Sequence, residues 1–129
     1  MKMSVIQKKI YYHDTDCGGV VYYSNYLKYM EEGRTEYFAG RNISLRDCAA
    51  QGLWFVVKQV DITYKAPARY EDTLAISTAV TDVSRASITF SQEIRHNDTV
   101  LVHATTTLVC VSPQFKPRAI PDEIRKTLS

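Results

Sequence analysis

The sequence predicts an α+β fold in which a curved antiparallel β-sheet wraps around one long helix. Two observations carry this prediction. One stretch near the N-terminus has helical periodicity, and from residue 53 almost to the end the chain alternates as consecutive strands do. Short connections favour antiparallel neighbours. A helix with apolar residues round most of its surface must also be covered on several sides.

An extended segment and an irregular turn open the chain. Residues 5–12 are rich in β-branched and aromatic side chains, which favours a strand. Residues 13–19 read HDTDCGG. Aspartate and glycine at this density are typical of a turn.

Two helices are predicted next. Apolar residues recur at intervals of three and four from Ser24 or Asn25 to Phe38, which predicts a long helix. A shorter helix is expected over residues 44–50. The residues expected to cap or stop these helices are Ser24, Gly40, Ser44 and Gly52.

Four strands and a terminal helical turn are predicted in the rest of the chain. The connections at residues 82–85 and 96–98 are short enough for hairpins, so neighbouring strands should be antiparallel. The expected ranges are 53–64, 73–83, 86–95 and 99–112 for the strands and 121–128 for the helical turn.

The composition is that of one folded domain spanning residues 1–129. A length of 129 residues lies within the usual range for a single domain. Hydrophobic residues make up 45% of the chain and charged residues 23%, which excludes a disordered tail. The net charge is only +2 and no run of Lys and Arg accompanies it, so no nucleic-acid partner is expected.

The cysteines and the N-terminal sequence predict a cytoplasmic protein. Cys17, Cys48 and Cys110 are far apart and never in a CxxC spacing, which argues against a disulfide framework and against structural zinc. The N-terminal sequence contains no apolar run of signal-peptide length. No stretch approaches the roughly 20 apolar residues that a transmembrane helix needs.

The segment from His13 to Tyr26 holds the densest set of candidate functional residues. It places two carboxylates, a histidine, a cysteine and two glycines ahead of a helix N-terminus, whose first N–H groups lack intrahelical acceptors. Such N–H groups stabilise an oxyanion, and glycines let the backbone approach a substrate closely. A carboxylate nearby can act as general base or nucleophile. These parts suit transfer of an acyl group to water.

Other interpretations of this segment stay open at this point. Asp14 and Asp16 are also residue types that bond to backbone N–H groups in ordinary turns. His13 with these two aspartates would be a minimal divalent-metal site, although no matching ligand cluster occurs elsewhere in the sequence. Cys17 as a thiolate nucleophile would need a histidine base and an orienting group brought in by the fold.

Three segments resemble one known family, in the right order along nearly the whole chain. The stretch YYHDTDCGGVVYYSNYLKYMEEGRTEYF is similar to the N-terminal motif of the hotdog-fold acyl-CoA thioesterases, in the 4-hydroxybenzoyl-CoA thioesterase and YbgC-like group. ITYKAPARYEDTL resembles the family's second-strand exit and Pro-Ala loop, and FKPRAIP resembles its C-terminal segment. The N-terminal pattern is met by Asp14, Asp16, Gly19, Val21, Tyr23, Tyr26, Glu31 and Arg34.

The resemblance implies a hotdog fold, with the long helix as the sausage and the antiparallel sheet as the bun. It also implies subunits that pair their sheets edge to edge, as a homodimer or a homotetramer. Asp16 matches the family's catalytic carboxylate, and the backbone N–H of Tyr23 matches the group that polarises the thioester carbonyl. Gly19 and Val21 belong to the same motif and are expected to lie against the substrate. No cofactor and no metal is implied.

The chain departs from the family pattern in two places. Many YbgC-like members have histidine where this chain has Tyr23, which puts a histidine-assisted step in doubt because tyrosine is not a proton acceptor near neutral pH. Gly33 replaces the usual alanine, at a cost of about 1 kcal/mol in helix propensity, and would permit close packing against another element.

Two carboxylates of the predicted helix have other possible roles. Glu31 can pair with Arg34, three residues further along the helix. Glu31 and Glu32 remain rivals to Asp16, because a related hotdog group uses a helix carboxylate.

The implied substrate is an acyl-CoA, whose phosphates need cationic partners. Arg85, at an expected hairpin turn, and Lys116 and Arg118, after the last strand, are the candidates for those contacts. The four tyrosines at positions 22, 23, 26 and 29 are expected mainly in the core or at an interface. Two other functions stay open, a hydroxyacyl-thioester dehydratase and a non-catalytic acyl-CoA-binding module.

Overall fold

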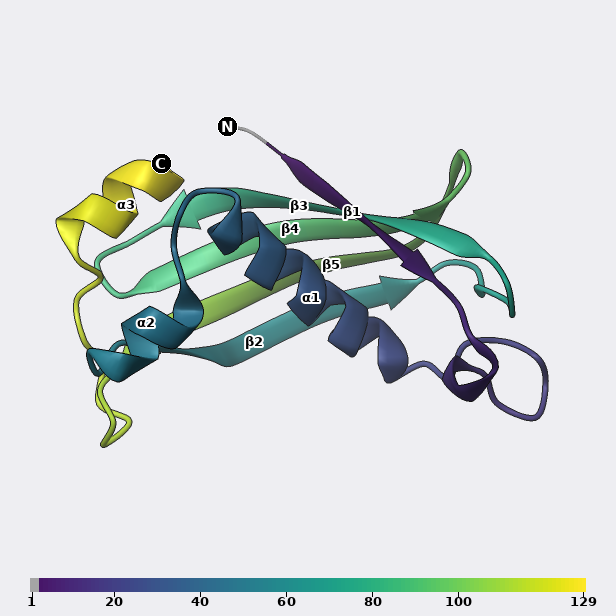
Figure 1. The fold of residues 1–129 in the computed structure, drawn as a ribbon, viewed down its shortest axis with the longest axis horizontal. Coiled ribbons are helices and arrows are strands. Elements are labelled where there is room, and N and C mark those ends of the chain that lie inside the picture. The colour runs from purple at the N-terminus through teal and green to yellow at the C-terminus, as the bar shows by residue number, and fades with distance from the viewer. Residues whose placement is uncertain (1–2) are drawn as a thin grey trace.

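The computed structural model describes residues 3–129 (Figure 1). Within this range a five-stranded antiparallel sheet, in the order β1-β3-β4-β5-β2, carries the long helix α1 across one face. This arrangement confirms the predicted α+β class. The elements are β1 (Ser4–Lys9), the 3-10 turn η1 (Tyr12–Asp14), α1 (Asn25–Ala39), α2 (Leu45–Ala50), β2 (Trp54–Tyr64), β3 (Thr73–Val83), β4 (Ser87–His96), β5 (Thr99–Val111) and α3 (Asp122–Leu128).

The strand and helix limits agree closely with those that the residue patterns predict. β3 has the predicted bounds. Apart from the first strand, every other predicted strand or helix differs from the structure by at most one residue at each end. The first strand is the exception. It ends at Lys9 rather than at Tyr12, because the chain turns into η1. Among residues 3–129, no helix is both long enough and apolar enough to span a bilayer.

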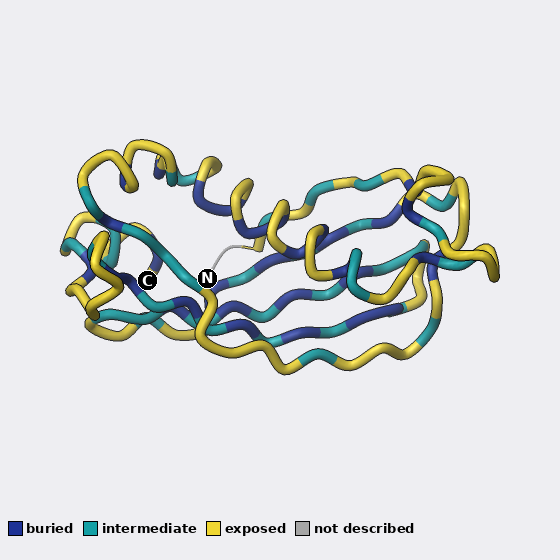
Figure 2. The backbone as a smooth tube through the Cα atoms, turned by 90° about the horizontal axis from the view of Figure 1, so that it is seen from below, coloured by how far each residue is buried: buried dark blue, intermediate teal, exposed yellow. Residues whose placement is uncertain are grey.

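Buried and partly buried residues alternate along the central strands (Figure 2), and the buried ones pack with residues of α1. The buried residues form two hydrophobic clusters, one under each end of α1. The cluster under the N-terminal end is built around Tyr26, Tyr29 and Met30 of the helix. The cluster under the C-terminal end is built around Tyr37 and Phe38.

α1 comes closest to the sheet at Gly33. A β-carbon there would lie only 2.8 Å from Thr78 Oγ1 and 3.0 Å from Gln92 Nε2. The close packing predicted for this glycine is therefore confirmed. Glu31 and Arg34 interact only through their charges and form no close ion pair among residues 3–129. The Arg34 guanidinium turns inward and donates to Gln92 Oε1 at 3.1 Å, while the Glu31 side chain is exposed.

The predicted cap positions are correct for both helices, but only α2 has the side-chain bond and the left-handed glycine typical of caps. Ser44 Oγ accepts the Asp47 N–H at 3.2 Å, and Gly52 has the left-handed φ of +78° that stops a helix. Ser24 precedes α1, but its φ and ψ of −72° and −17° are already helical and its side chain makes no capping bond. Gly40 also stays helical, at φ −65°.

The two edges of the sheet differ in how they are covered. β1 pairs with β3, and α1 packs against both strands. β2 forms the other edge, and its inward-facing row is apolar although three of its members are exposed by 36–52%. A bulge after Val57 keeps both Val57 and Val60 on this inner face. The row consists of Phe55, Val57, Val60, Ile62 and Tyr64.

Candidate active site

The segment that carries Asp16 folds as a tight hairpin at the N-terminal end of α1. The Asp16 N–H donates to the Val20 carbonyl at 2.9 Å, and Thr15 forms a bridge with Val21. Val21 in turn donates its N–H to Ala68 O at 2.9 Å, in the connection between β2 and β3. The hairpin is therefore fastened to the sheet rather than free in solvent.

Asp16 is exposed, and its two carboxylate oxygens have different surroundings. Oδ1 accepts the Gly18 N–H at 2.8 Å, so part of the side chain serves the turn. Oδ2 accepts no hydrogen bond from residues 3–129. One oxygen thus orients the carboxylate, and the other remains open toward a substrate or a water molecule.

The two glycines of the hairpin have separate reasons for being glycine. A β-carbon at Gly18 would lie 3.2 Å from Asp16 Oδ1, so a side chain there would crowd the carboxylate. Gly19 adopts φ +80°, a conformation that side chains rarely tolerate. The sequence predicted close backbone approach to a substrate, and the structure shows that Gly19 shapes the hairpin itself.

The start of α1 offers an unpaired donor. No acceptor within residues 3–129 receives the Tyr23 N–H. The first turn of α1 also contains no Asp or Glu, so its partial positive charge is not neutralised locally. This N–H can therefore bind an oxygen that acquires negative charge.

A pocket of about 290 Å³ adjoins Tyr23 and is walled by aromatic side chains. The ring of Tyr64 lies edge-on to Tyr23 with centroids 6.2 Å apart, and 5.7 Å from the ring of Tyr26. The Tyr26 hydroxyl accepts the Ala68 N–H at 3.0 Å, and burial raises the pKa of Tyr26. The lining residues are Val21, Tyr23, Tyr26, Tyr64, Lys65, Ala66 and Pro67.

The wall formed by residues 64–67 was not predicted as part of a site. In the sequence these residues belong to the segment ITYKAPARYEDTL, which resembles the family but does not by itself indicate a pocket wall. The tyrosine run divides between two roles. Tyr26 and Tyr29 are buried in the core, whereas Tyr22 and Tyr23 are 48% and 60% exposed.

The rivals to Asp16 occupy other surroundings. Glu31 and Glu32 are exposed on α1, beyond its first turn. Cys17 is an exposed free thiol beside Asp16. His13 Nε2 lies 3.8 Å from Asp14 Oδ2, but residues 3–129 contain no group of three or more His, Cys, Asp or Glu arranged to hold a metal ion.

The segments that carry the three candidate phosphate ligands, the β3–β4 turn and the stretch after β5, lie at the opposite end of the sheet from the loop between η1 and α1 (Figure 1). Arg118 Nη1 donates to the Gln51 and Gly52 carbonyls at 3.3 and 3.0 Å. The Arg85 carbonyl accepts the Ile120 N–H at 2.8 Å, which holds the segment of Arg118 beside the β3–β4 turn. β2 runs from this end to the pocket, a length of roughly 30 Å. A single chain therefore does not bring Asp16 together with Arg85, Lys116 or Arg118.

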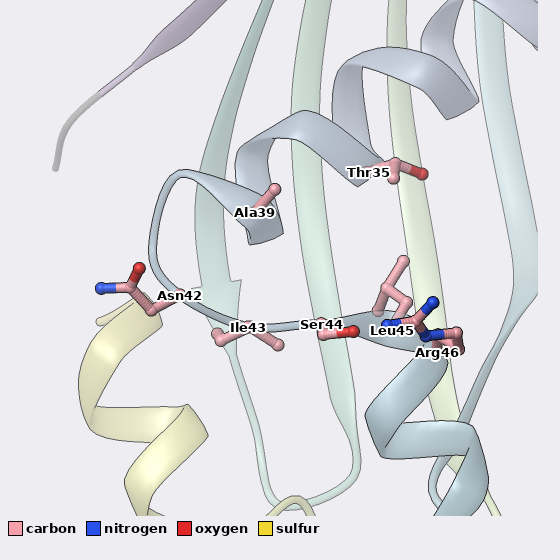
Figure 3. Close-up of a pocket in the computed structure, with 7 residues that line it drawn as sticks. All are labelled: Thr35, Ala39, Asn42, Ile43, Ser44, Leu45 and Arg46. Carbon is pink, nitrogen blue, oxygen red and sulfur yellow. The ribbon is translucent and has the colours of Figure 1, made fainter.

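A larger pocket, of about 510 Å³, lies at the C-terminal end of α1 (Figure 3). Its walls come from the last turns of α1, the following loop and the start of α2. It is separated from the Asp16 hairpin by the length of a 15-residue helix, about 22 Å. Neither Asp16 nor the N-terminus of α1 contributes to it.

Sequence comparison matches the chain to known thioesterases over almost its full length. The model of the "Thioesterase-like superfamily" matches residues 11–128. The acyl-CoA thioester hydrolase YbgC of Escherichia coli is 40% identical over 118 residues, which cover 90% of this chain and 88% of that protein. The acyl-CoA thioesterase YbgC of Haemophilus influenzae is 40% identical over 119 residues, covering 91% and 88%.

Solved structures agree with the sequence match. A probable thioesterase from Bartonella henselae superposes with a TM-score of 0.89 at 30% identity, covering 93% of this chain and all of that one. A 4-hydroxybenzoyl-CoA thioesterase mutant complexed with 4-hydroxybenzoyl-CoA superposes with a TM-score of 0.92 over the full length of both chains. At 16% identity, this second likeness concerns the fold alone. The predicted hotdog fold is confirmed, and the chain belongs to the thioesterase-like superfamily.

Proposed function

We propose that the protein hydrolyses acyl-CoA thioesters, with Asp16 as the reacting carboxylate and the Tyr23 N–H as the oxyanion donor. One observation carries the proposal. A carboxylate with an open oxygen and an unpaired helix-start N–H belong to the same hairpin–helix junction. The YbgC relatives named as acyl-CoA thioesterases support the substrate class.

Two routes use these groups and differ in the first bond that forms. As nucleophile, Asp16 attacks the thioester carbon, the C–S bond breaks, CoA leaves as thiolate, and water then cleaves the resulting anhydride. As general base, Asp16 takes a proton from a water molecule whose oxygen attacks the same carbon. In both routes the negative charge on the carbonyl oxygen faces the Tyr23 N–H. Neither route requires a metal ion or an organic cofactor.

The pocket beside Tyr23 is the proposed site of the acyl group. Val21 and Tyr23 line it on the hairpin side, and Tyr64 closes it from β2. Gly19 supports this arrangement through its backbone conformation rather than through a side-chain contact. An apolar wall at this position accepts the acyl chain while leaving the thioester carbon near the helix start.

The proposal includes a homodimer formed by edge pairing of β2, alone or within a tetramer. β2 has no strand on its outer side within residues 3–129, and its apolar inner row is partly exposed. In an antiparallel pair of identical strands, the Trp54 end of one β2 lies beside the Tyr64 end of the other. Arg85, Lys116 and Arg118 of one subunit would then approach the Asp16 site of its partner and bind the CoA phosphates.

The other two functions are less well supported. A hydroxyacyl-thioester dehydratase generally uses histidine with a carboxylate, and Tyr23 occupies the position where many relatives have histidine. A pure acyl-CoA-binding module would not need a carboxylate with an open oxygen at the carbonyl site. The proposed location is the cytoplasm, because Cys17, Cys48 and Cys110 are all free thiols.

Release of free thiol from a panel of acyl-CoA substrates tests the proposal directly. Saturating turnover on at least one substrate, with stoichiometric carboxylic acid, is the expected result. Hydration of an enoyl-CoA without thiol release would indicate the dehydratase. Tight acyl-CoA binding with neither reaction would indicate the binding module, and either result would overturn the proposed hydrolase.

A further inference from the structure

The Asp16 hairpin carries a second carboxylate that the proposed mechanism does not use. Asp14 lies two residues before Asp16, yet it is only 7% exposed whereas Asp16 is exposed. A buried carboxylate costs free energy unless its oxygens are well partnered. Its contacts therefore indicate what it does.

The backbone and side chain of Asp14 tie together three separate parts of the site. Oδ2 accepts the Tyr11 N–H at 2.9 Å, where the chain enters the hairpin. The Asp14 carbonyl accepts the Tyr22 N–H at 3.1 Å, where the chain leaves it. The same carbonyl accepts Asn25 Nδ2 at 2.9 Å, from the first residue of α1. Asp16 lies between the entry and the exit, and Tyr23 directly follows the exit.

The groups that face the Asp14 carboxylate favour its ionised form. Burial alone would raise the pKa of Asp14, but the Tyr11 N–H, the Tyr29 hydroxyl and the charges of His13 and Lys8 outweigh it, so the pKa is lowered. Tyr29 is buried in α1, and its hydroxyl makes no hydrogen bond of good geometry within residues 3–129. Its interaction with Asp14 is electrostatic and links the helix to the hairpin.

We propose that Asp14 is a positioning residue of the thioesterase site, which holds the Asp16 carboxylate in register with the Tyr23 N–H at the start of α1. The inference rests on the proposed role of Asp16. Misplacement of a reacting group by about 1 Å can cost on the order of 10²-fold in rate. Loss of the Asp14 side chain leaves both carbonyl bonds but removes the Tyr11 bond and the interaction with Tyr29. The entry to the hairpin is then loosened, so kcat should fall, while KM, which depends on contacts elsewhere, changes little.

Asp72 provides a matched control. Its Oδ2 accepts the Arg69 N–H at 2.8 Å, the same bond to the third preceding residue that Asp14 makes with Tyr11. Asp72 also carries an ion pair to His96 at 3.5 Å, but it is not part of the hairpin. Asp72→Ala thus removes an equivalent turn bond. Its partner Arg69 forms a bridge with Val20, so this control perturbs the support of the hairpin while leaving every bond that Asp14 makes.

The test compares kcat, KM and Tm for Asp14→Ala, Asp14→Asn and Asp72→Ala on one acyl-CoA. We expect similar losses of Tm for the two alanine variants, a fall in kcat of roughly 10- to 100-fold for Asp14→Ala only, and KM within about twofold of the wild type. Asp14→Asn keeps an oxygen acceptor for the Tyr11 N–H and should recover part of the lost kcat.

Two results would overturn the inference. One is a kcat for Asp14→Ala within twofold of the wild type, and the other is an equal loss in Asp72→Ala, which would indicate general destabilisation. If Asp14→Ala does not fold, Asp14→Asn is compared with Asp72→Asn, and unchanged kcat in both overturns it. Asp16→Asn is assayed in parallel. Full activity of that variant would sink the proposed role of Asp16, whereas its inactivity beside a fully active Asp14→Ala would sink only the role of Asp14.

Discussion

The two ends of α1 present opposite chemistry on one scaffold. At its N-terminal end, the junction of hairpin and helix carries an open carboxylate oxygen on Asp16 and an unpaired backbone N–H on Tyr23. Toward its C-terminal end lie the segments that carry Arg85 and Arg118, and Arg118 donates to the Gln51 and Gly52 carbonyls just after α2. The difference between the two ends is one of available groups: the first offers a carboxylate and a free donor, which suit the proposed reaction, and the second offers cations, which suit the proposed binding of phosphate. About 30 Å of β2 keeps them apart within one chain.

The largest expected effect is the loss of kcat on substitution of Asp16. Asp16→Asn should lower kcat by on the order of 10²–10⁴, because a positioned acid–base group contributes that much. The fold should survive, since Asp16 is exposed. Steady-state kinetics measure kcat, and circular dichroism checks that the fold is retained. Glu31→Gln is the control and should stay near wild-type activity; inactive Glu31→Gln beside active Asp16→Asn would reverse the assignment.

A second prediction concerns the strand that separates the ends. Val60→Lys puts a charge on the exposed apolar row of β2, which should prevent a partner from covering it. We expect a monomer by light scattering at micromolar concentration, and a larger loss of kcat/KM than any single cation substitution causes. Thr81→Lys, exposed on β3, is the control and should remain oligomeric and active. A stable wild-type monomer would contradict the proposed assembly.

A third prediction concerns Arg85 and Arg118, the arginines proposed to bind the CoA phosphates. Arg85→Ala and Arg118→Ala should each raise KM for acyl-CoA roughly five- to thirty-fold with kcat nearly unchanged, because phosphates bind alike in ground and transition states. Higher salt should shrink the effect. Activity on an acyl-pantetheine lacking the nucleotide should be unaffected. Equal losses on both substrates would show that these residues do not bind the phosphates.

The smallest expected effect concerns Asp14 and the loss of folding stability at low pH. Burial raises the pKa of Asp14, but the Tyr11 N–H, the Tyr29 hydroxyl and the charges of His13 and Lys8 together outweigh it, so the pKa is lowered from its usual value of 3.8. The ionised form therefore stabilises the fold above that value, and this contribution is lost as the pH falls through the lower folded-state pKa. Urea unfolding at pH 6 and pH 3 gives the free energy of unfolding at each pH. Between these values it should fall less for Asp14→Asn than for the wild type. An identical loss would contradict this prediction.

Local patterns in the sequence were sufficient for most of the fold. The limits of β3 and the Ser44 cap of α2 depend on neighbouring residues, so periodicity and capping rules predict them. The 3-10 turn η1 was missed because the aromatic, β-branched run continues through it, while the Asp14 side chain bends the chain. The Arg34 partner was missed for a different reason. Gln92 lies 58 residues away, and only the packing of α1 on the sheet brings the two together.

The candidate site was predictable in part. Asp16 and Tyr23 are predicted from the resemblance of one continuous motif, from HDTDCGG into the helix after it, and their roles stay predictions. Tyr64 and its neighbours could not be placed beside them without the strand order. The separation of Arg85, Lys116 and Arg118 from Asp16 also depends on topology, since sequence distance does not show which end of a sheet a turn occupies.

Gly33 has a consequence beyond its own contacts. Its missing side chain lets α1 rest directly on Thr78 and Gln92, and a helix of 15 residues behaves as a rigid rod. A larger residue there would press on Thr78 and Gln92, so that either those side chains or the helix itself would have to shift. The position of the helix start, where the proposed oxyanion donor lies, thus depends partly on an absent methyl group in the middle of the helix.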